Sequence, residues 1–384
     1  MKNLILCLAR LFKAVLITLT LTGNGSFAQV VIEGNKGNRL KAFAVAQFNS
    51  PWALDFLSKT QLLVTTKPGV LWIVATDGKK QKVQGIPDVA FGGQGGLGDV
   101  VAHPQYEKND LIYLSYIEED TTTGAKGAVV IRGTLDLKGM PKLRDVERIW
   151  TQIPKMQSEG HYSHRLAFGP AESAQQGKLF VSSGDRQYQN PAQRWDMALG
   201  KIIRLNEDGT LPPDNPFQEK GELAKSYWSL GHRNALGLAF DQKGRLWSHE
   251  MGPRDGDELN LIEKGANFGW PVVSEGTHYD GTKIPSHDTR REFKPPKVAW
   301  IPTIAPSGLV IYSGAARTKW TGDAFIGGLR SRALLRIDMN ETQAKEAERY
   351  TWGQRIRDVE EGPNGTLWVI EDGPKGRLIQ LLLD

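Results

Sequence analysis

Cysteine is nearly absent from this chain of 384 residues. The only one, Cys7, lies in the N-terminal stretch 1–28, which has the layout of a cleavable export signal. That stretch contains a short apolar run at 14–21 and a small-x-small cleavage site, Ser26-Phe27-Ala28. We expect cleavage after Ala28, which leaves a mature chain without disulfides, and a periplasmic or secreted location.

Long hydrophobic segments and runs of basic residues are also missing. The apolar run at 14–21 is far shorter than the roughly 20 residues that span a bilayer, so an uncleaved anchor is the weaker alternative. Lys2, Arg10 and Lys13 all lie in the signal, and the formal charge of +5 therefore falls to +2 without it. This balance gives no support to nucleic-acid binding. We expect no nucleic-acid partner and no membrane span in the mature chain.

Long helical periodicity is absent, whereas turn residues are plentiful, with 42 glycines and 20 prolines. A turn followed by a short apolar run recurs six times, often with a Gly-x-Leu-Trp-like opening. The six occurrences are 68–78, 109–116, 177–185, 244–252, 322–329 and 365–373. Radial repetition of this kind is typical of β-propeller blades. The sequence thus predicts an all-β protein in which 29–384 form one propeller, with long loops between blades.

Three tryptophans stand at matching positions in the repeats. They are Trp72, Trp247 and Trp368. Large aromatic side chains at equivalent places in a repeat are usually packed in the core. We expect them to pack between blades and to have no role in ligand binding.

A glycine-rich run at 91–99 surrounds Gln94. Glycines let a backbone turn sharply or approach a ligand closely. A phosphate-binding P-loop is not indicated, because no helix and no Gly-Lys-Ser/Thr follow. The run fits a tight loop and a ligand wall equally well.

Two histidines and an arginine precede an apolar run at 166–168. They are His161, His164 and Arg165. Neutral histidine can take a proton from a bound alcohol near pH 7. Two alternatives stay open, a purely structural pair and a transition-metal site, although no third ligand follows at metal-site spacing.

The densest group of polar and turn residues lies at 231–271. Arg233 and Asn234 offer forked donors suited to carboxylates or quinone oxygens. Farther along, four acidic residues flank the turn Gly252-Pro253; they are Glu250, Asp255, Asp257 and Glu258. Carboxylates beside exposed backbone carbonyls suit calcium, and a solvated acidic turn is the alternative.

Arginines recur near the C-terminus. Arg355 and Arg357 alternate, and in a strand they would point to the same face. Two guanidinium groups on one face repel each other unless an anion lies between them or water screens them. Together with Arg233 and Arg330, they are suited to surround a multiply charged anion at the propeller axis.

In their order along the chain, these stretches closely resemble the soluble quinoprotein sugar dehydrogenases of the glucose/sorbosone dehydrogenase family, and especially its bacterial aldose sugar dehydrogenase branch. The likeness covers roughly Phe43 to the C-terminus. It rests on GGQGGLGDVVAHPQY, the His-x-x-x-Arg at 161–165, GHRNALGLAF, EMGPRDGDELNLI, NFGWP and RIRDV. The resemblance implies a six-bladed β-propeller that uses pyrroloquinoline quinone and calcium.

The resemblance also implies roles for single residues. His161 would be the general base that removes the hydroxyl proton while hydride passes from C1 of an aldose to the quinone, which gives a lactone. The quinone would be bound by Gln94, Arg233, Asn234, Gly328, Leu329, Arg330, Arg355, Ile356 and Arg357. Calcium would be bound by backbone carbonyls of Gly252 and Pro253, with Glu258 and the Phe268 carbonyl at a further position. An external electron acceptor and a monomer or homodimer are expected.

Three positions depart from the family pattern. His164 stands where members usually have a small residue, so a bulky side chain would enter beside the base. Arg330 stands where some members have lysine, which keeps the charge but changes its reach. Asp185-Arg186 replaces the Asp-Gln of the glucose-oxidising branch near the sugar site, and these changes bear on specificity.

Two other functions fit a propeller with an acidic axis. A calcium-dependent lactonase or esterase would not need converging arginines. A non-catalytic propeller that binds a protein or glycan could lack His161 or the arginines, and this chain has both. An oxidoreductase that acts on aldose sugars therefore fits the residues best.

Overall fold

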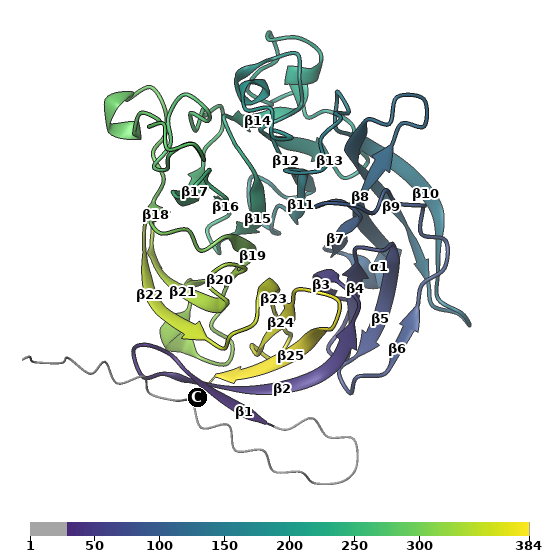
Figure 1. The fold of residues 1–384 in the computed structure, drawn as a ribbon. Helices are drawn as coiled ribbons and strands as arrows, with labels where there is room; N and C mark the ends of the chain where they lie inside the picture. The colour runs from purple at the N-terminus through teal and green to yellow at the C-terminus, as the bar shows by residue number, and fades with distance from the viewer. Residues whose placement is uncertain (1–28, 384) are drawn as a thin grey trace, which may run out of the picture.

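Six antiparallel sheets surround a central axis in the computed structural model, which describes residues 29–383 (Figure 1). Their innermost strands face one another across the axis, and the other strands follow outward. The predicted six-bladed β-propeller is confirmed. The predicted signal at 1–28, with Cys7, lies outside the described residues.

Blades 1 to 5 each consist of four consecutive strands. Blade 1 comprises β3 (Pro51–Phe56), β4 (Gln61–Thr66), β5 (Val70–Ala75) and β6 (Lys80–Lys82). Blade 2 comprises β7 (Leu97–Ala102), β8 (Leu111–Glu119), β9 (Lys126–Asp136) and β10 (Lys142–Thr151). Blade 3 comprises β11 (Ser163–Phe168), β12 (Lys178–Ser183), β13 (Lys201–Asn206) and β14 (Tyr227–Leu230).

The next two blades follow the same plan. Blade 4 comprises β15 (Ala235–Phe240), β16 (Leu246–Glu250), β17 (Asp257–Ile262) and β18 (Val298–Trp300). Blade 5 comprises β19 (Pro306–Ile311), β20 (Ala324–Gly328), β21 (Ala333–Asn340) and β22 (Gln343–Thr351).

Blade 6 joins the two ends of the described chain. It comprises β23 (Ile356–Glu361), β24 (Leu367–Glu371), β25 (Gly376–Leu383), β2 (Arg39–Phe48) and β1 (Val30–Glu33). The N-terminal strand β2 pairs with the C-terminal strand β25, from Leu40 opposite Leu383 to Phe48 opposite Gly376. This pairing closes the ring of blades, so the hydrogen bonds between β2 and β25 resist opening of the propeller.

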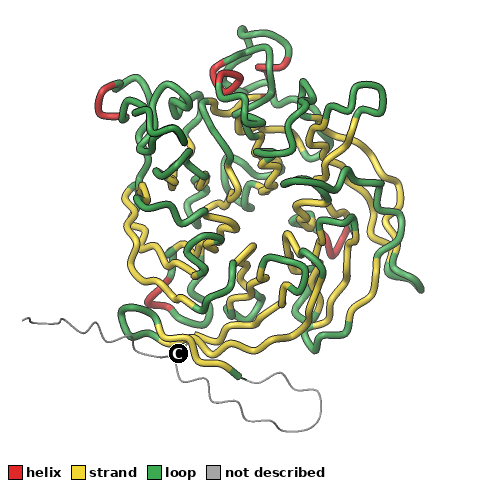
Figure 2. Tube along the Cα trace, in the orientation of Figure 1, coloured by secondary structure: helices red, strands yellow, loops and turns green. Residues whose placement is uncertain are grey.

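Helical structure in residues 29–383 is limited to short turns outside the sheets (Figure 2). They are α1 (Tyr106–Asn109), η1 (Asn190–Gln193), η2 (Leu223–Ser226), η3 (His287–Thr289) and η4 (Thr318–Trp320). Long loops carry most of them, and such loops are where propellers place their functional residues. Within residues 29–383, no helix has the length and apolar character needed to cross a membrane.

The core lies between neighbouring blades. Strands alternate inward and outward residues, so each sheet presents apolar side chains on both faces to the next blade. Leu63 of blade 1 packs with Leu114 of blade 2, for example, and Phe180 of blade 3 packs with Leu246 of blade 4. Burial of one such side chain contributes roughly 1.5–3 kcal/mol. Packing all around the ring fixes the position of the innermost strands, which carry the site.

The prediction of matching tryptophans is right for two of the three. Trp247 and Trp368 lie on the second strands of blades 4 and 6, β16 and β24, and are buried between blades. Trp72 lies instead on the third strand of blade 1, β5, where its ring contacts Phe48 at 6.0 Å between centroids. Five of the six repeats mark a second strand, whereas the first marks a third strand. The prediction of an equivalent position is therefore wrong for Trp72.

Candidate active site

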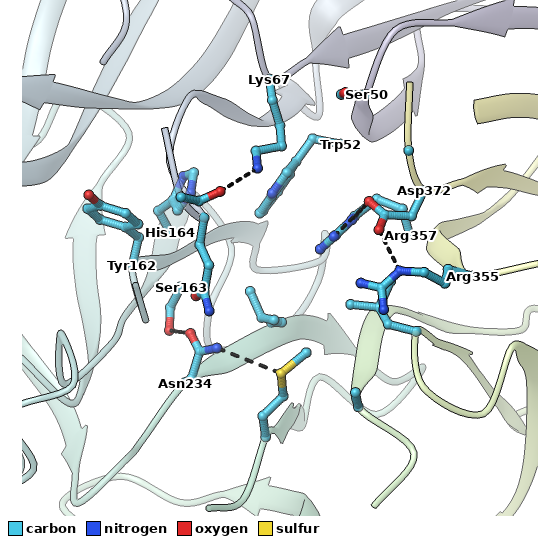
Figure 3. A pocket seen from close by; sticks show the side chains of 17 residues that line it. Ser50, Trp52, Lys67, Tyr162, Ser163, His164, Asn234, Arg355, Arg357 and Asp372 are labelled. Carbon is cyan, nitrogen blue, oxygen red and sulfur yellow. Dashed lines mark hydrogen bonds and ion pairs between the residues drawn. The ribbon is translucent and has the colours of Figure 1, made fainter. Parts of the chain in front are cut away.

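A cavity of 460 Å³ lies on the axis (Figure 3). Two sets of residues line it. One set stands at or just before the first residues of the innermost strands and includes Trp52, Gln94, Ser163, Asn234, Ala305 and Arg355. The other set directly follows second strands and consists of Lys67, Met251, Leu329 and Asp372. The same end of every blade thus faces the cavity.

Each innermost strand has an irregular register near its start, as β-bulges produce. In blade 3 the shift lies between Ser163 and Leu166. Here His161, Ser163 and His164 have φ values of 47°, 59° and 57°, which non-glycine residues rarely adopt. Each such conformation costs about 1–3 kcal/mol and persists where surrounding contacts enforce it. The backbone strain in this blade is concentrated where the chemistry is predicted.

His161 forms a buried pair with Asp185, which follows β12. Nδ1 of His161 lies 2.7 Å from Oδ1 of Asp185, and the indole Nε1 of Trp270 donates to Oδ2 at 2.7 Å. With Nδ1–H donating to Asp185, Nε2 is left as the basic nitrogen. The backbone N–H of His161 donates to Oε1 of Gln94 at 2.8 Å. His161 is 8% exposed and does not line the main cavity, whereas Gln94 does.

Burial lowers the pKa of His161 below its usual value of 6.5. The hydrogen bond that His161 donates to Asp185 raises the pKa of His161, whereas the positive charge of Arg233 adds to the lowering. The imidazole is therefore neutral at pH 7, in agreement with what a proton-accepting role requires.

Arg233 and Asn234 are neighbours in sequence but face different cavities. Asn234 lines the main cavity, and its Oδ1 accepts a hydrogen bond from Ser163 at 3.2 Å. Arg233 lines a smaller cavity beside it, donates from Nη1 to the carbonyl of Met251 at 3.0 Å, and lies 5.3 Å from the ring centroid of Trp270.

Positive charge gathers on the side of the main cavity formed by blades 1 and 6. Arg355 and Arg357 do face the same way, and the anion between them is Asp372 of the chain itself (Figure 3). Their nitrogens lie 2.7 and 2.8 Å from its carboxylate. Burial opposes ionisation of Asp372, but the two arginines lower its pKa. Lys67 donates to the carbonyl of Gly93 at 2.9 Å. Three cations and one carboxylate leave an excess of positive charge that suits an anionic ligand.

The other residues predicted to bind the quinone lie at the edge of this arrangement. Leu329 lines the main cavity, and Gly328 is buried beside it at the end of β20. Ile356 begins β23 and points into the core between blades 5 and 6. Arg330 is exposed and is not part of the lining. Arg355 and Arg357 thus meet in the main cavity, while Arg233 and Arg330 do not enter it.

The four residues predicted to bind calcium come together in the smaller cavity. Gly252, Pro253, Glu258 and Phe268 line it with Glu250, and its volume of 10 Å³ is about that of one ion or water. Within the described residues, no group of three or more His, Cys, Asp or Glu side chains is arranged as metal ligands. A cation here would be bound mainly by backbone carbonyls.

The donor atoms around this smaller cavity fit a hard cation. Burial raises the pKa of Glu258 well above its usual value, and the nearby charge of Glu250 raises it further. Asn260 donates to both carboxylates at 3.2 Å, and its own Oδ1 is buried without a partner. Carboxylate and carbonyl oxygens are the donors that calcium prefers. Asp257 does not line this cavity. Its Oδ2 accepts hydrogen bonds from the backbone N–H groups of Ile304 and Ala305 at 2.8 Å.

His164 forms part of the wall of the main cavity. Its ring stacks on Trp52 with centroids 4.8 Å apart, and Nδ1 lies 2.8 Å from the hydroxyl of Ser115. Gly98 makes room for it, because a Cβ at Gly98 would come within 1.9 Å of the ring. Burial lowers the pKa of His164 to about 3. His161 and His164 thus have separate partners, which gives the transition-metal alternative no support.

The sequence analysis did not predict three residues that line the main cavity, Trp52, Lys67 and Asp372. Asp372 lies near the end of the repeat 365–373, just as Asp185 ends the repeat 177–185, so repeat ends were a usable signal. Lys67 follows β4, but the repeat recognised in blade 1 is β5. The end of that repeat therefore did not indicate Lys67.

A family model described as Glucose / Sorbosone dehydrogenase matches residues 48–380. The chain is 35% identical over 345 residues to aldose sugar dehydrogenase YliI of Escherichia coli (strain K12), covering 87% of this chain and 90% of that protein.

Two solved structures are similar over the whole propeller. The apo-form of the soluble aldose sugar dehydrogenase from Escherichia coli has a TM-score of 0.85 and 32% identity, covering 90% of this chain and 100% of that one. The PQQ-bound form of aldose sugar dehydrogenase from Streptomyces coelicolor has a TM-score of 0.73 and 28% identity, covering 90% and 98%.

Proposed function

Because this chain belongs to the Glucose / Sorbosone dehydrogenase family, we propose that it oxidises the C1 hydroxyl of aldose sugars to lactones with pyrroloquinoline quinone and calcium as cofactors. The observation that carries this proposal is the buried His161–Asp185 pair beside a cavity with an excess of cationic side chains. A relative with a similar fold binds PQQ, which supports the choice of cofactor.

The residues of the main cavity fit the quinone. It carries three carboxylates, and Lys67, Arg355 and Arg357 would bind them, while Gln94 and Asn234 would donate to its oxygens. When bound, the quinone supplies a two-electron acceptor for the hydride that leaves the sugar. The flat ring of Trp52 offers an apolar surface for a planar cofactor.

His161 would act as the general base. Nε2 takes the proton of the C1 hydroxyl while C1 loses hydride, so that the C1–O bond becomes the carbonyl of the lactone. Asp185 would accept a hydrogen bond from Nδ1–H, which keeps this nitrogen protonated, and its negative charge would stabilise the imidazolium that forms. The indole N–H of Trp270 fixes the orientation of this carboxylate. Gln94 fixes the backbone of His161 from the side of the cavity.

Calcium would be bound at the smaller cavity by the carbonyls of Gly252 and Pro253, with Glu258 and the Phe268 carbonyl at a further position. When bound, it would supply Lewis-acid stabilisation of developing negative charge. The raised pKa of Glu258 supports this assignment, since a divalent cation would offset the repulsion between Glu258 and Glu250.

We further propose that 29–384 act as one domain after removal of the signal, in the periplasm or outside the cell, with an external electron acceptor. The pairing of β2 with β25 supports a single unit, because the N-terminal strand completes the last blade.

Reconstitution tests the function. The mature chain is purified, calcium and pyrroloquinoline quinone are added, and dye reduction is followed with a panel of aldoses. We expect saturable quinone binding and sugar-dependent reduction. Absence of quinone binding would contradict the proposal and favour a lactonase or a non-catalytic binding propeller.

A further inference from the structure

Arg186 is an unusual residue in this site because it is charged and completely buried. It follows Asp185 in sequence, is 0% exposed, and does not line the main cavity. The sequence-based interpretation placed Asp185-Arg186 near the sugar with an influence on specificity. The Arg186 side chain points into the protein and does not line the main cavity, and its influence on specificity stays a prediction.

The guanidinium of Arg186 is bonded to neutral oxygens rather than to a carboxylate. Nε donates to the carbonyl of Gly160 at 2.9 Å, Nη1 to that of Lys126 at 2.5 Å, and Nη2 to that of Ser158. Cζ lies 3.7 Å from the ring centroid of Tyr162. Burial of a charge without a counter-ion is costly, and several good hydrogen bonds and a cation–π contact are needed to offset it.

Apart from the hydrogen bond to Lys126 of blade 2, these contacts are made around His161. Ser158 and Gly160 precede it, Tyr162 follows it, and the backbone N–H of Arg186 donates to the carbonyl of His161 itself at 3.3 Å. His161 and Arg186 both have positive φ values, 47° and 56°. Strained residues of this kind stay in place only when their surroundings enforce the conformation.

We propose that Arg186 is the positioning residue for His161: its guanidinium fixes segment 158–162 so that Nε2 of His161 stays directed at the reacting hydroxyl. The inference rests on the proposed function, in which His161 is the base. A displacement of about 1 Å in a catalytic group can cost roughly 10²-fold in rate, so a residue that fixes the segment affects kcat without touching the substrate.

The charge of Arg186 has a second effect on the same histidine. The charged groups that face His161 are Asp185, Arg233 and Arg186. Asp185 raises the pKa of His161, and the two arginines lower it. Loss of Arg186 therefore both frees the segment and raises the pKa of the imidazole.

The test compares Arg186→Met with the matched control Arg204→Met. Arg204 is also buried, at 2% exposed, lies in the same blade, and stacks on the ring of Trp228 at 4.9 Å. It bonds to Asp214 and Asn215 instead of segment 158–162. Both variants lose a buried guanidinium, so a purely structural effect would appear in both.

Two measurements are made on each variant. The first is the titration of the His161 ring by ¹⁵N NMR on the mature chain without cofactor, assigned by the signal that His161→Gln removes. The second is steady-state kinetics of the reconstituted enzyme. We expect Arg186→Met to raise the pKa of His161 and to lower kcat about 10–100-fold, with KM and the quinone Kd within about threefold. Arg186→Lys should recover part of kcat, and Arg204→Met should change neither measurement.

Unchanged titration and kcat in Arg186→Met would overturn the inference, as would equal changes in Arg204→Met. If Arg186→Met does not fold, Arg186→Lys and Arg204→Lys are compared in the same way. If the wild-type chain oxidises no sugar, the proposed function fails, but the NMR comparison still decides whether Arg186 positions His161.

Discussion

The Nδ1 atom of His161 lies 2.7 Å from a carboxylate oxygen of Asp185, and this carboxylate is completely buried. Trp270 donates to its other oxygen, so the carboxylate has a fixed orientation. The pair explains how a histidine on a strained backbone can present one defined nitrogen to a substrate.

Asp185→Asn should lower kcat by roughly 10²–10⁴-fold, as expected when a general base loses the partner that orients it. The amide can accept from Nδ1–H of His161 only if its NH₂ faces the indole N–H of Trp270, so one contact is lost. Steady-state kinetics checks this. Asp196→Asn is a matched control, because Asp196 is exposed and pairs with exposed Arg194. Equal kcat values in the two variants would contradict the prediction.

The acid limb of the pH profile should lie below pH 6.5. His161 accepts a proton only when it is neutral, and burial lowers its pKa from 6.5. Activity is therefore lost as the pH falls through this lowered pKa. The measurement is kcat/KM of the reconstituted enzyme between pH 4 and pH 9. A midpoint above pH 7 would show that His161 does not control the limb.

Arg357→Gln should weaken quinone binding about 10–100-fold, because hydrogen bonds to charged groups contribute about 1.5–3 kcal/mol each. Arg330→Gln should have a much smaller effect, since Arg330 is exposed and outside the lining. Titration of both variants with quinone, followed by absorbance, measures the difference. Equal losses would mean that Arg330 reaches the cofactor after all.

Calcium should raise the thermal midpoint of the mature chain, and chelation should reverse this. A ligand at 100 times its Kd stabilises the folded state by about 2.7 kcal/mol. Glu258→Gln should reduce the shift, whereas Glu263→Gln should not, because Glu263 pairs with Lys294 outside the cavity. Differential scanning fluorimetry with added calcium or chelator checks this. A full shift in Glu258→Gln would remove Glu258 from the site.

The buried acids Asp55 and Asp99 should contribute stability that is lost as the pH rises from about 4 to about 7. Below the main cavity, Arg165 contacts Asp99 at 3.1 Å and Asp358 at 3.0 Å, and burial raises the pKa of Asp55 from 3.8 to about 7 and that of Asp99 to about 6. These acids keep their protons in the folded chain at a pH at which the unfolded chain has lost them, so their own contribution to stability decreases as the pH rises through this window.

Removal of one acid from the same group tests this sign. Burial and the charge of Asp55 raise the pKa of Glu360. Glu360→Gln should therefore be more stable than the wild type at pH 8 and equally stable at pH 4. Thermal midpoints at the two pH values measure it, with exposed Glu107→Gln as the control. A lower thermal midpoint for Glu360→Gln than for the wild type at pH 8 would show that these buried acids do not destabilise the fold when they ionise.

Several features could be predicted from the sequence because they are local. Repeats of a turn and a short apolar run indicated the blades, and the spacing of Arg355 and Arg357 indicated a shared direction, which their common contact with Asp372 confirms. The contact of His161 with Asp185 and that of His164 with Ser115 could not be predicted in this way. They depend on how separate strands meet at bulges, and Gly98 from blade 2 decides how much room His164 has.

Arg186 shows the same limit more clearly. Its neighbour Asp185 faces His161. The alternation of side-chain directions along a strand does not predict whether the next side chain, that of Arg186, is buried or exposed. The structure places its guanidinium among carbonyls of segment 158–160 and of Lys126, which belongs to another blade. These hydrogen bonds cannot be predicted unless the relative positions of blades 2 and 3 in the folded chain are known.

We have proposed His161 as the base in a quinone-dependent sugar oxidation. The most direct test compares wild type with His161→Gln after reconstitution with calcium and pyrroloquinoline quinone. Quinone should bind both proteins with similar affinity, and the aldose-dependent reduction rate of His161→Gln should be lower by roughly 10²–10⁴-fold. Full turnover by His161→Gln with bound quinone would contradict the account.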